Sequence, residues 1–459
     1  MANEAWVTAK IESLIEDGTI LAHKDGNYGS SYPRVHEFGE EGVPFLTAKL
    51  LTDSGQIDLE AAPRLAEEKA NKLTYGFIEA GDVLLSHNAT VGRVAVVPAL
   101  CERVLVGTSL TYYRVDPERL LPRYLAAFFK GRGFQNQLRA VMSHSTRNQV
   151  PITAQRQLTV VVPPLPEQRR IAHILGTLAD KIELNRRMNE TLEAMAQALF
   201  KSWFVDFDPV FDNALAAGYL IPAAFAARAA QRAAVRGQYP PLPDHLLALF
   251  PDRFQDSPLG PIPEGWEAGC IGDIGENPRR GIKPEAIPEG TPYIGLEHVP
   301  RGSIALGEWG DSSTIGSGKN VFNQGEILFG KLRPYFHKVG VPIVDGVCST
   351  DILVLVPRVE HWFGLLLGHA SSVPLVAAVS AAASGTKMPR TKWKDLAGYP
   401  IAVPPAELAE HLNQHIRPSL QQIRQDIHES RALADLRDTL LPQLLGGECS
   451  RPGCPPRRS

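Results

Sequence analysis

Val161-Val162-Pro163-Pro164-Leu165-Pro166-Glu167-Gln168 returns later in the chain as Ala402-Val403-Pro404-Pro405-Ala406-Glu407, and each copy leads into a long helical pattern. The apolar positions of the second helical pattern lie 241 residues after those of the first. A strand that ends in Pro-Pro and is followed by a long heptad-like helix is an unusual motif. Its repetition in one register predicts an internal duplication, with two globular halves that are each followed by one arm of a helix pair.

The repeat also reaches upstream of the prolines. Residues 42–46 (Gly-Val-Pro-Phe-Leu) match residues 290–294 (Gly-Thr-Pro-Tyr-Ile), and residues 81–85 (Gly-Asp-Val-Leu-Leu) match residues 325–329 (Gly-Glu-Ile-Leu-Phe). Each is a Gly or Pro turn that leads into a short apolar run, which is typical of a loop followed by a buried strand. We therefore expect an α+β protein in which two duplicated mixed α/β domains are separated by two long helices packed as an antiparallel coiled coil.

These matches also predict the boundaries of the parts. The segment between the halves is Ala-rich from 214 to 234 and then Pro-rich, which favours an extended or turn-rich connection. The expected parts are a first domain at 1–164, a first long helix at 165–205, a linker at 206–262, a second domain at 263–405, a second long helix at 406–447 and a disordered tail at 448–459.

The two helical patterns carry the seam of a coiled coil, because apolar residues recur at alternating spacings of four and three. The residues expected to pack between the arms are Ile171, Leu175, Ile182, Asn185, Leu192 and Leu199 in the first arm and Leu412, Ile416, Ile423, Leu433 and Leu440 in the second. A buried Asn such as Asn185 more commonly fixes the register of a helix pair than adds stability. In the alternative reading each helix merely caps its own domain, but the apolar stripes are longer than a domain of roughly 150 residues can cover.

The composition is that of an ordinary soluble protein. The 459 residues are 44% hydrophobic and 21% charged, with a net charge of −3. No apolar run is long enough for a membrane span, and the N-terminal residues do not have the pattern of a signal peptide. The five cysteines are scattered and form no Cys-x-x-Cys pair, which favours a reducing cytoplasm without structural zinc.

Charge and side-chain chemistry indicate a nucleic-acid ligand. Residues 76–164 contain ten Lys or Arg against five Asp or Glu, and residues 319–400 contain nine against five. Two polar loops in each half carry groups that read bases or hold phosphates, although any one of these residues could equally form a turn. The candidate DNA-binding residues are Ser86, His87, Asn88, Arg93, His144, Ser145, Thr146, Arg147, Asn148 and Gln149 in the first half and Lys331, Arg333, Tyr335, Lys338, Ser384, Thr386, Lys387 and Arg390 in the second. The halves share their strands but not these side chains, which suggests two different targets read by one scaffold.

The sequence lacks the catalytic motifs of enzymes that act on nucleic acids. It contains no Asn/Asp-Pro-Pro-Tyr/Phe motif, no Gly-rich loop for S-adenosylmethionine and no complete P-loop, and no metal-ligand cluster is evident. We therefore predict a chain that is not an enzyme and holds no metal or cofactor of its own.

Together these features resemble the specificity (S) subunit of type I restriction–modification enzymes over nearly the whole chain. The resemblance rests on residues 163–172 (PPLPEQRRIA), on residues 199–207 (LFKSWFVDF) and on residues 81–84 (GDVL). The second copy departs from the pattern, because residues 404–410 (PPAELAE) lack the Gln and the Ile of the first.

The resemblance implies a division of labour. Each half would be a target-recognition domain for one part of a bipartite site in double-stranded DNA, and the helices would set the gap between the parts and dock two methyltransferase (M) subunits. Restriction (R) subunits would join that complex, and S-adenosylmethionine, ATP and Mg would serve the partner subunits. Two other classes stay open on the residues alone: a stand-alone DNA-binding regulator, and a coiled-coil structural adaptor that binds no nucleic acid.

Overall fold

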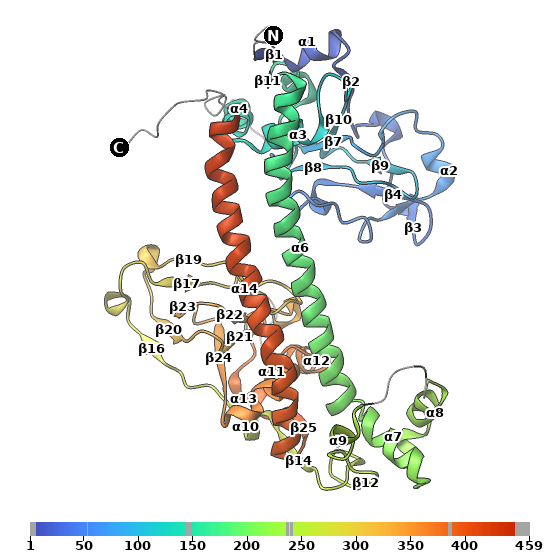
Figure 1. Ribbon diagram of the computed structural model, residues 1–459, viewed down its shortest axis with the longest axis vertical. Coiled ribbons are helices and arrows are strands. Elements are labelled where there is room, and N and C mark those ends of the chain that lie inside the picture. Colours follow the sequence, from blue (N-terminus) through green and yellow to red (C-terminus); the bar gives the residue numbers. More distant parts are fainter. Residues whose placement is uncertain are drawn as a thin grey trace. The chain divides into compact units, whose positions relative to one another are not determined.

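The computed structural model describes residues 6–52, 54–143, 148–235, 238, 242–383 and 388–445, and it confirms the expected α+β architecture (Figure 1). The chain divides into two compact units: unit 1 consists of Met1–Glu183 with Arg431–Ser459, and unit 2 of Leu184–Ser430. The two long helices are α6 (Leu165–Phe204) and α14 (Ala406–Leu445), each of 40 residues. The division therefore lies inside both helices rather than at their ends.

Unit 1 is built from short strands and helices that precede α6. Its helices are α1 (Ile11–Glu16), α2 (Glu67–Ala70), α3 (Pro122–Lys130), α4 (Arg132–Ser143) and α5 (Ile152–Gln155). Its strands are β1 (Val7–Lys10), β2 (Ile20–Asp25), β3 (Phe38–Gly39), β4 (Val43–Leu46), β5 (Arg64–Leu65), β6 (Phe77–Ile78), β7 (Val83–Ser86), β8 (Val94–Val96), β9 (Val104–Val106), β10 (Leu110–Val115) and β11 (Thr159–Val162).

The strands of unit 1 form three sheets, in the orders β2-β10-β7-β8, β3-β5-β4-β9-β6 and β1-β11. The first sheet is antiparallel, and the second contains one parallel pair, β4 with β9. Apolar side chains of the first sheet, such as Val83 and Tyr113, share a core with Leu125, Phe129 and Phe134 of α3 and α4. Each such side chain contributes about 1.5–3 kcal/mol through burial, so these helices and the sheet stabilise one another.

Unit 2 contains the corresponding elements of the second half. Its helices after residue 262 are α10 (Ile271–Ile274), α11 (Phe363–Ala370), α12 (Val373–Ala382) and α13 (Trp393–Ala397). Its strands there are β14 (Glu267–Cys270), β15 (Gly275–Glu276), β16 (Gly281–Ile282), β17 (Pro292–Ile294), β18 (Ala305–Leu306), β19 (Gly310–Asp311), β20 (Lys319–Phe322), β21 (Ile327–Gly330), β22 (Val339–Pro342), β23 (Gly346–Cys348), β24 (Ile352–Pro357) and β25 (Pro400–Val403).

The strand pairings confirm the duplication. In unit 1 Thr111 pairs with Leu85, and in unit 2 Leu353 pairs with Phe329 in the same antiparallel arrangement of central strands. The parallel pair β4–β9 corresponds to β17–β23, and the terminal pair β1–β11 to β14–β25. Equivalent turns also coincide: Gly81 (φ 91°) and Gly325 (φ 82°) are both left-handed, a conformation that glycine adopts without steric cost.

Residues 206–262 form more structure than the linker that we expected. They contain α7 (Asp208–Ala217), α8 (Ala226–Val235), α9 (Asp244–Leu247), β12 (Phe254–Gln255) and β13 (Ile262–Pro263). Phe207, Phe211 and Phe250 belong to the same buried cluster as Trp203 of α6 and Trp266. Aromatic residues spaced through a turn-rich sequence thus fold against the end of α6, because burying each ring removes a large apolar area from water.

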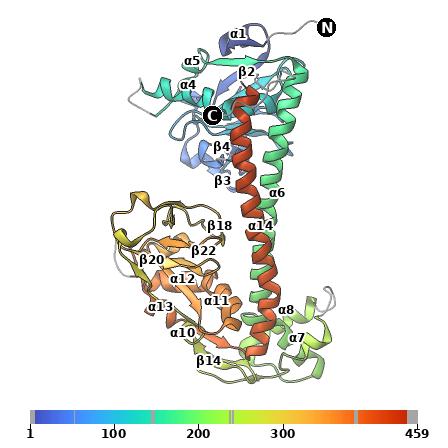
Figure 2. The same ribbon diagram turned by 60° about the vertical axis from the view of Figure 1, so that its left-hand side comes forward.

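The helices α6 and α14 lie side by side and run antiparallel (Figures 1 and 2). Within unit 2 the Asn185 amide donates to Glu429 Oε2 at 2.8 Å and the Trp203 ring contacts His415 at 5.8 Å, so the residue numbers run in opposite directions along the pair. Asn185 is 2% exposed, so this asparagine is buried between the helices.

The seam differs in detail from the predicted one. Ile171, Leu175, Leu412, Ile416 and Ile423 are buried, as expected. Half-buried are Ile182, Leu192, Leu199, Leu433 and Leu440. The fully buried side chains near these are Phe200, Leu441 and Leu444. Towards the helix ends the buried position thus shifts by one residue, from Leu199 to Phe200 and from Leu440 to Leu441.

A buried amide holds the start of each long helix against its domain. In unit 1 Gln168 accepts a hydrogen bond from Leu121 N (2.8 Å) and donates to the carbonyls of Arg119 and Pro163. In unit 2 the equivalent of Gln168 is Ala409, and Asn413 takes its place one helical turn later. Asn413 accepts from Gly364 N (2.7 Å) and donates to the carbonyls of residues 360 and 361.

One carboxylate ties α6 to the sheet of unit 2. Glu193 is 5% exposed, and its oxygens accept hydrogen bonds from Ser303 Oγ, Ile304 N and Ala305 N at 2.8–3.0 Å. Burial raises the pKa of Glu193, and the three hydrogen bonds oppose that rise. The equivalent position in α14 is Ala434, so this anchor belongs to one half alone.

Among the described residues, no single helix is both long and apolar enough to cross a membrane. The neighbouring segments Glu360–Ala370 and Val373–Ala382 would suffice together in length and composition, but the chain bends by 69° between them.

Candidate nucleic-acid interface

The two polar loops predicted in the first half meet in the structure. Asn88 forms an isolated β-bridge with Gln149. Val150 N donates to the His87 carbonyl at 2.8 Å, and Ala89 N donates to the Asn148 carbonyl at 3.1 Å. The end of β7 and the segment before α5 are therefore joined by main-chain hydrogen bonds, although 60 residues separate them in the sequence.

Unit 2 repeats the same arrangement. Leu332 forms an isolated β-bridge with Arg390. Thr391 N donates to the Lys331 carbonyl at 3.0 Å, and Arg333 N donates to the Pro389 carbonyl at 2.8 Å. We call this arrangement the corner: residues 87–89 with 148–150 in unit 1, and residues 331–333 with 389–391 in unit 2.

Both corners contain a non-glycine residue in the left-handed region. Ala89 has φ 63° and Arg333, at the equivalent position, has φ 50°. Such a conformation costs roughly 1–2 kcal/mol for an L-residue, and here the backbone N–H of the same residue makes the bond that closes the corner. Because the same strained backbone conformation occurs at the equivalent residue of both halves, the corner is part of the duplicated fold rather than a chance turn.

The structure assigns different roles to the predicted residues of the first corner. Ser86 and His87 are 0% and 5% exposed, so the prediction that they contact DNA is corrected: Ser86 is the last residue of β7, His87 follows it, and both support the loop from inside. Arg93 donates to the Leu51 carbonyl at 2.8 Å and thus holds a neighbouring loop. Asn148 is exposed, and Asn88 and Gln149 are half-buried, so these three amides remain at the surface. His144, Ser145, Thr146 and Arg147 lie outside the described residues.

The second corner presents longer and more basic side chains. Tyr335 is 55% exposed, and Lys331 and Arg333 are partly exposed. Arg390 forms an ion pair with Asp351 (Nε to Oδ1, 3.1 Å). Lys338 donates to the Leu296 carbonyl, and burial lowers its pKa. Ser384, Thr386 and Lys387 lie outside the described residues.

Sequence reasoning missed several residues that shape these surfaces. The short helical turn Pro334–Phe336 directly follows the second corner. The Arg301 guanidinium lies 4.1 Å from the ring centre of Phe336, and this cation–π contact stabilises the turn. Asp351 pairs with Arg390, and the fully buried Gln155 lies beneath the first corner. Phe336 stood within a basic run and could have been noticed, but Gln155 carries no local signal.

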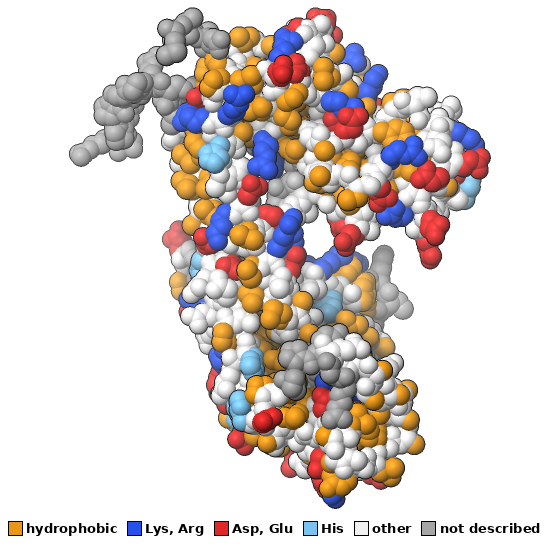
Figure 3. Space-filling view, turned by 45° about the vertical axis from the view of Figure 1, so that its right-hand side comes forward, with side chains coloured by type: hydrophobic (Ala, Val, Ile, Leu, Met, Phe, Trp, Pro, Cys, Tyr) orange, Lys and Arg blue, Asp and Glu red, His pale blue; other side chains and the backbone are white. Residues whose placement is uncertain are grey.

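Positive charge is distributed rather than gathered into one patch on the face that Figure 3 draws. Lys and Arg side chains of unit 1 are interspersed there with Asp and Glu. The net excess of Lys and Arg between residues 76 and 164 therefore coexists with acidic neighbours on this face. Specific contacts at the corners, more than a uniformly basic surface, are what this arrangement can supply.

Comparison with known proteins shows similarity to one family. A family model described as the type I restriction modification DNA specificity domain matches residues 24–194. The type I restriction enzyme MjaIX specificity subunit of Methanocaldococcus jannaschii is 24% identical over 439 residues, which cover 92% of this chain and 90% of that protein. The HindI specificity subunit of Haemophilus influenzae is 24% identical over 404 residues, which cover 81% of this chain and 87% of that protein.

The chain is similar to type I restriction–modification specificity (S) subunits along nearly its whole length. A crystal structure of the type I restriction–modification S subunit from M. genitalium has the same fold, with a TM-score of 0.51, 14% identity and 97% coverage of both chains. The fold is thus shared over both halves, and the MjaIX relative also matches the second copy, in which the Gln of the first motif is absent.

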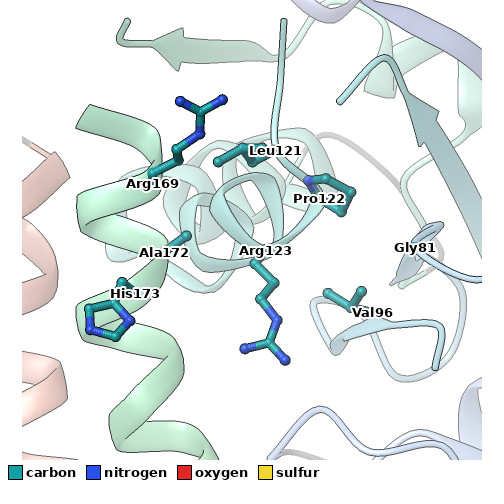
Figure 4. Close-up of a pocket in the computed structure, with 8 residues that line it drawn as sticks. All are labelled: Gly81, Val96, Leu121, Pro122, Arg123, Arg169, Ala172 and His173. Atoms are coloured by element: carbon teal, nitrogen blue, oxygen red, sulfur yellow. The ribbon is translucent and has the colours of Figure 1, made fainter. Parts of the chain in front are cut away.

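A small pocket lies where α3 meets α6 in unit 1 (Figure 4). It has a volume of about 390 Å³ and is lined by Arg123 of α3 and by Arg169 and His173 of α6, among others. At the equivalent positions the second half has Gly364, Glu410 and Gln414, so the cationic lining is not duplicated. Within the described part of the chain, no group of three or more His, Cys, Asp and Glu side chains is placed to hold a metal ion.

Proposed function

We propose that this S subunit reads a bipartite site in double-stranded DNA, with the corner of unit 1 facing one part and the corner of unit 2 facing the other. The observation that carries the proposal is the duplicated corner itself. Two surfaces have the same main-chain hydrogen bonds and the same left-handed residue, but they differ in every exposed side chain. A scaffold that is kept while its surface changes fits two different base sequences.

The side chains of each corner suit base recognition. Asn and Gln can pair bidentately with adenine, and Arg with guanine. The first corner presents Asn88, Asn148 and Gln149, and the second presents Lys331, Arg333 and Arg390. We therefore expect adenine to be prominent in the part read by unit 1 and guanine in the part read by unit 2.

The proposal extends to partners. The helices α6 and α14 would dock two methyltransferase subunits, and restriction subunits would join the complex. In this assembly the S subunit itself would be non-catalytic and would bind no cofactor, whereas S-adenosylmethionine, ATP and Mg would act in the partner subunits. The relatives are named as specificity subunits of type I restriction enzymes, which supports a recognition role for this chain within a larger complex.

The helices would also set the gap between the two parts of the site. A 40-residue helix is on the order of 60 Å long. Deleting one heptad from each arm, Ile182–Met188 and Ile423–Glu429, removes segments that face each other, together with Asn185 and its partner Glu429. Each helix shortens by about 10 Å and turns by only about 20°, so both domains keep nearly the same rotation about the helix axes.

Selection of binding duplexes from a random pool tests the proposal. The full-length protein should enrich two fixed blocks at a constant gap, and the heptad-deleted variant should enrich the same blocks with a gap shorter by about three base pairs, since each base pair spans about 3.4 Å. One block alone would contradict the bipartite reading. An unchanged gap with altered blocks would show that the helices do not set the distance between the two parts of the site.

A further inference from the structure

A buried polar network lies beneath the corner of unit 1, and Gln155 is at its centre. The side chain of Gln155 is 0% exposed. Its Oε1 accepts a hydrogen bond from the Tyr113 hydroxyl at 2.6 Å, and its Nε2 donates to Thr111 Oγ1 at 3.0 Å and to the Val150 carbonyl at 2.9 Å. The last bond attaches the side chain to the corner itself.

The network reaches the other side of the corner through His87. Thr111 Oγ1 lies 2.8 Å from His87 Nδ1. Because Thr111 Oγ1 already accepts a hydrogen bond from Gln155, its own hydrogen is free to be donated to the histidine nitrogen. Burial lowers the pKa of His87, so the ring is neutral at physiological pH and Nδ1 can accept. His23 adds a further contact, with its Nε2 at 3.4 Å from Gln155 Oε1.

Gln155 thereby fixes the two strands of the corner relative to each other. Val150 is held at both of its backbone groups: its N–H donates to the His87 carbonyl and its carbonyl accepts from Gln155. The ring of His87 is held from below by Thr111. The exposed Asn148 and the half-buried Gln149 come directly before Val150, so their main chain is set by this arrangement.

Unit 2 forms the same corner without such a network. The equivalents of Gln155, Thr111 and Tyr113 are Leu396, Leu353 and Leu355, and all three are buried in an apolar core. Folding of the corner therefore does not require a buried amide beneath it. Burying an amide, two hydroxyls and two imidazoles costs desolvation free energy even when they are hydrogen-bonded, so the polar version in unit 1 calls for a role beyond the fold.

We infer that Gln155 is a positioning residue that sets the sequence specificity of unit 1. This inference rests on the proposed function, because it assumes that the first corner reads bases. Short Asn and Gln side chains reach a base edge only from an accurately placed main chain, whereas the long Lys and Arg side chains of the second corner adjust their own reach. The corner with short side chains is the one that Gln155 supports.

The test compares Gln155→Leu with a matched control, Gln137→Leu, in the full-length protein. Gln137 lies in the same unit and is also bonded through both ends of its amide, to Thr159 N at 2.8 Å and to the Thr159 carbonyl at 3.1 Å. It joins α4 to β11 and does not contact the corner. Both substitutions remove several hydrogen bonds, so a general loss of stability affects both variants.

Affinity is measured for the duplex selected by the wild type and for duplexes mutated in the first or the second block. Gln155→Leu should lower the discrimination at the first block about tenfold and leave discrimination at the second block unchanged. Gln137→Leu should leave both ratios unchanged. Each ratio is independent of the fraction of folded protein, because unfolded chains are lost equally from every measurement.

Two further variants separate positioning from folding. Thr111→Val removes the hydroxyl that joins Gln155 to His87 but leaves the bond from Gln155 to the Val150 carbonyl, so it should lower first-block discrimination less than Gln155→Leu does. The pair Gln155→Leu with Thr111→Leu copies Leu396 and Leu353 of unit 2, and it should recover melting temperature but not discrimination. Recovery of discrimination in this pair, or equal ratios in Gln155→Leu and wild type, would overturn the inference. If the wild type itself discriminates at neither block, the proposed function fails instead.

Discussion

Unit 1 and unit 2 build one corner on opposite supports. Beneath the first corner lie Gln155 and Thr111, and beneath the second lie Leu396 and Leu353. The main-chain bonds of the two corners nevertheless have matching donors and acceptors. The difference teaches that the strand ladder and the left-handed residue define the corner, while the core beneath it can be polar or apolar.

The starts of the two long helices teach the same lesson. Gln168 in α6 and Asn413 in α14 each pair with backbone groups just before and at the start of the neighbouring domain helix, yet they do not occupy equivalent positions. Asn has one methylene fewer than Gln, and a position one turn further along α14 compensates for its shorter reach. The two halves therefore share this hydrogen-bonding role although they do not share the residue or its position.

The largest effect that we expect concerns His369, a buried histidine of unit 2 that has no histidine at the equivalent position of unit 1. His369 is 6% exposed, burial lowers its pKa to about 3, and its equivalent in unit 1 is Phe128. The unfolded chain takes up a proton below about pH 6.5 and the folded chain does not, so unit 2 loses stability as pH falls from 6.5 towards 3. Over the interval from pH 6.5 to 4 the loss is about 3 kcal/mol, and His369→Phe should abolish it.

Hydrogen exchange of each unit between pH 7 and pH 4 measures this loss, after correction for the intrinsic exchange rate. Unit 1 supplies the internal control, because burial lowers the pKa of His23 to about 4 and the variant leaves that group unchanged. Unit 1 should thus remain acid-sensitive in the variant. Equal acid sensitivity of unit 2 in wild type and His369→Phe would refute the assignment.

The next effect compares the two amides. Gln168→Ala should destabilise the contact between α6 and α3, and Asn413→Ala the contact between α14 and α11, each by about 2 kcal/mol, because buried backbone groups lose their partners. Local hydrogen exchange should rise at residues 119–124 in the first variant and at 360–366 in the second. A rise at both sites in either variant would show that the amides do not act on their own domains.

Substitutions at the corners should have a smaller effect on base discrimination. Asn148→Ala should weaken discrimination at the block read by unit 1, and Arg390→Ala at the block read by unit 2, each about tenfold or about 1.4 kcal/mol. Binding to block-mutated duplexes at fixed salt measures both. Uniform weakening for all duplexes, with a salt slope lowered by about one, would instead make the residue a phosphate contact.

Glu193 should give the smallest effect. Its pKa is raised in the folded state, so its protonated form is favoured there, and unit 2 should lose stability as pH rises through the folded-state pKa. The slope cannot exceed about 1.4 kcal/mol per pH unit for one proton, and Glu193→Gln should flatten it. Denaturant unfolding of unit 2 in the His369→Phe background isolates this change from the opposite effect of the histidine. An unaltered slope would assign the pH dependence to another group.

The fold could be predicted from the sequence because the repeat consists of patterns within short stretches of the chain. The Pro-Pro ends of β11 and β25 and the helices that begin at Leu165 and Ala406 follow from spacing and composition within short windows. The two candidate loops of each half meet in the structure, which the sequence analysis did not predict. By contrast, residues 206–262 read as a linker, because their aromatic residues have no periodicity and become a core only against Trp203 and Trp266.

The interface itself was less predictable. Ser86 and His87 are polar residues beside a polar loop, and nothing local distinguishes them from the exposed Asn148. The direction of a side chain at the end of a strand depends on the last pleat of that strand and on what covers it. Arg93 likewise follows a polar loop, yet its guanidinium donates a hydrogen bond to the carbonyl of Leu51.

The sequence by itself determined the duplication, its register of 241 residues, the two 40-residue helices and the similarity to S subunits, since each depends on residues that are near neighbours along the chain or copies of one another. Only the tertiary structure decided which polar groups are buried and what they hold. Gln155 meets Thr111, Tyr113 and His23 across 44, 42 and 132 residues. Hydrogen bonds over such separations form only after the sheets and α5 have packed, so no pattern along the chain announces them.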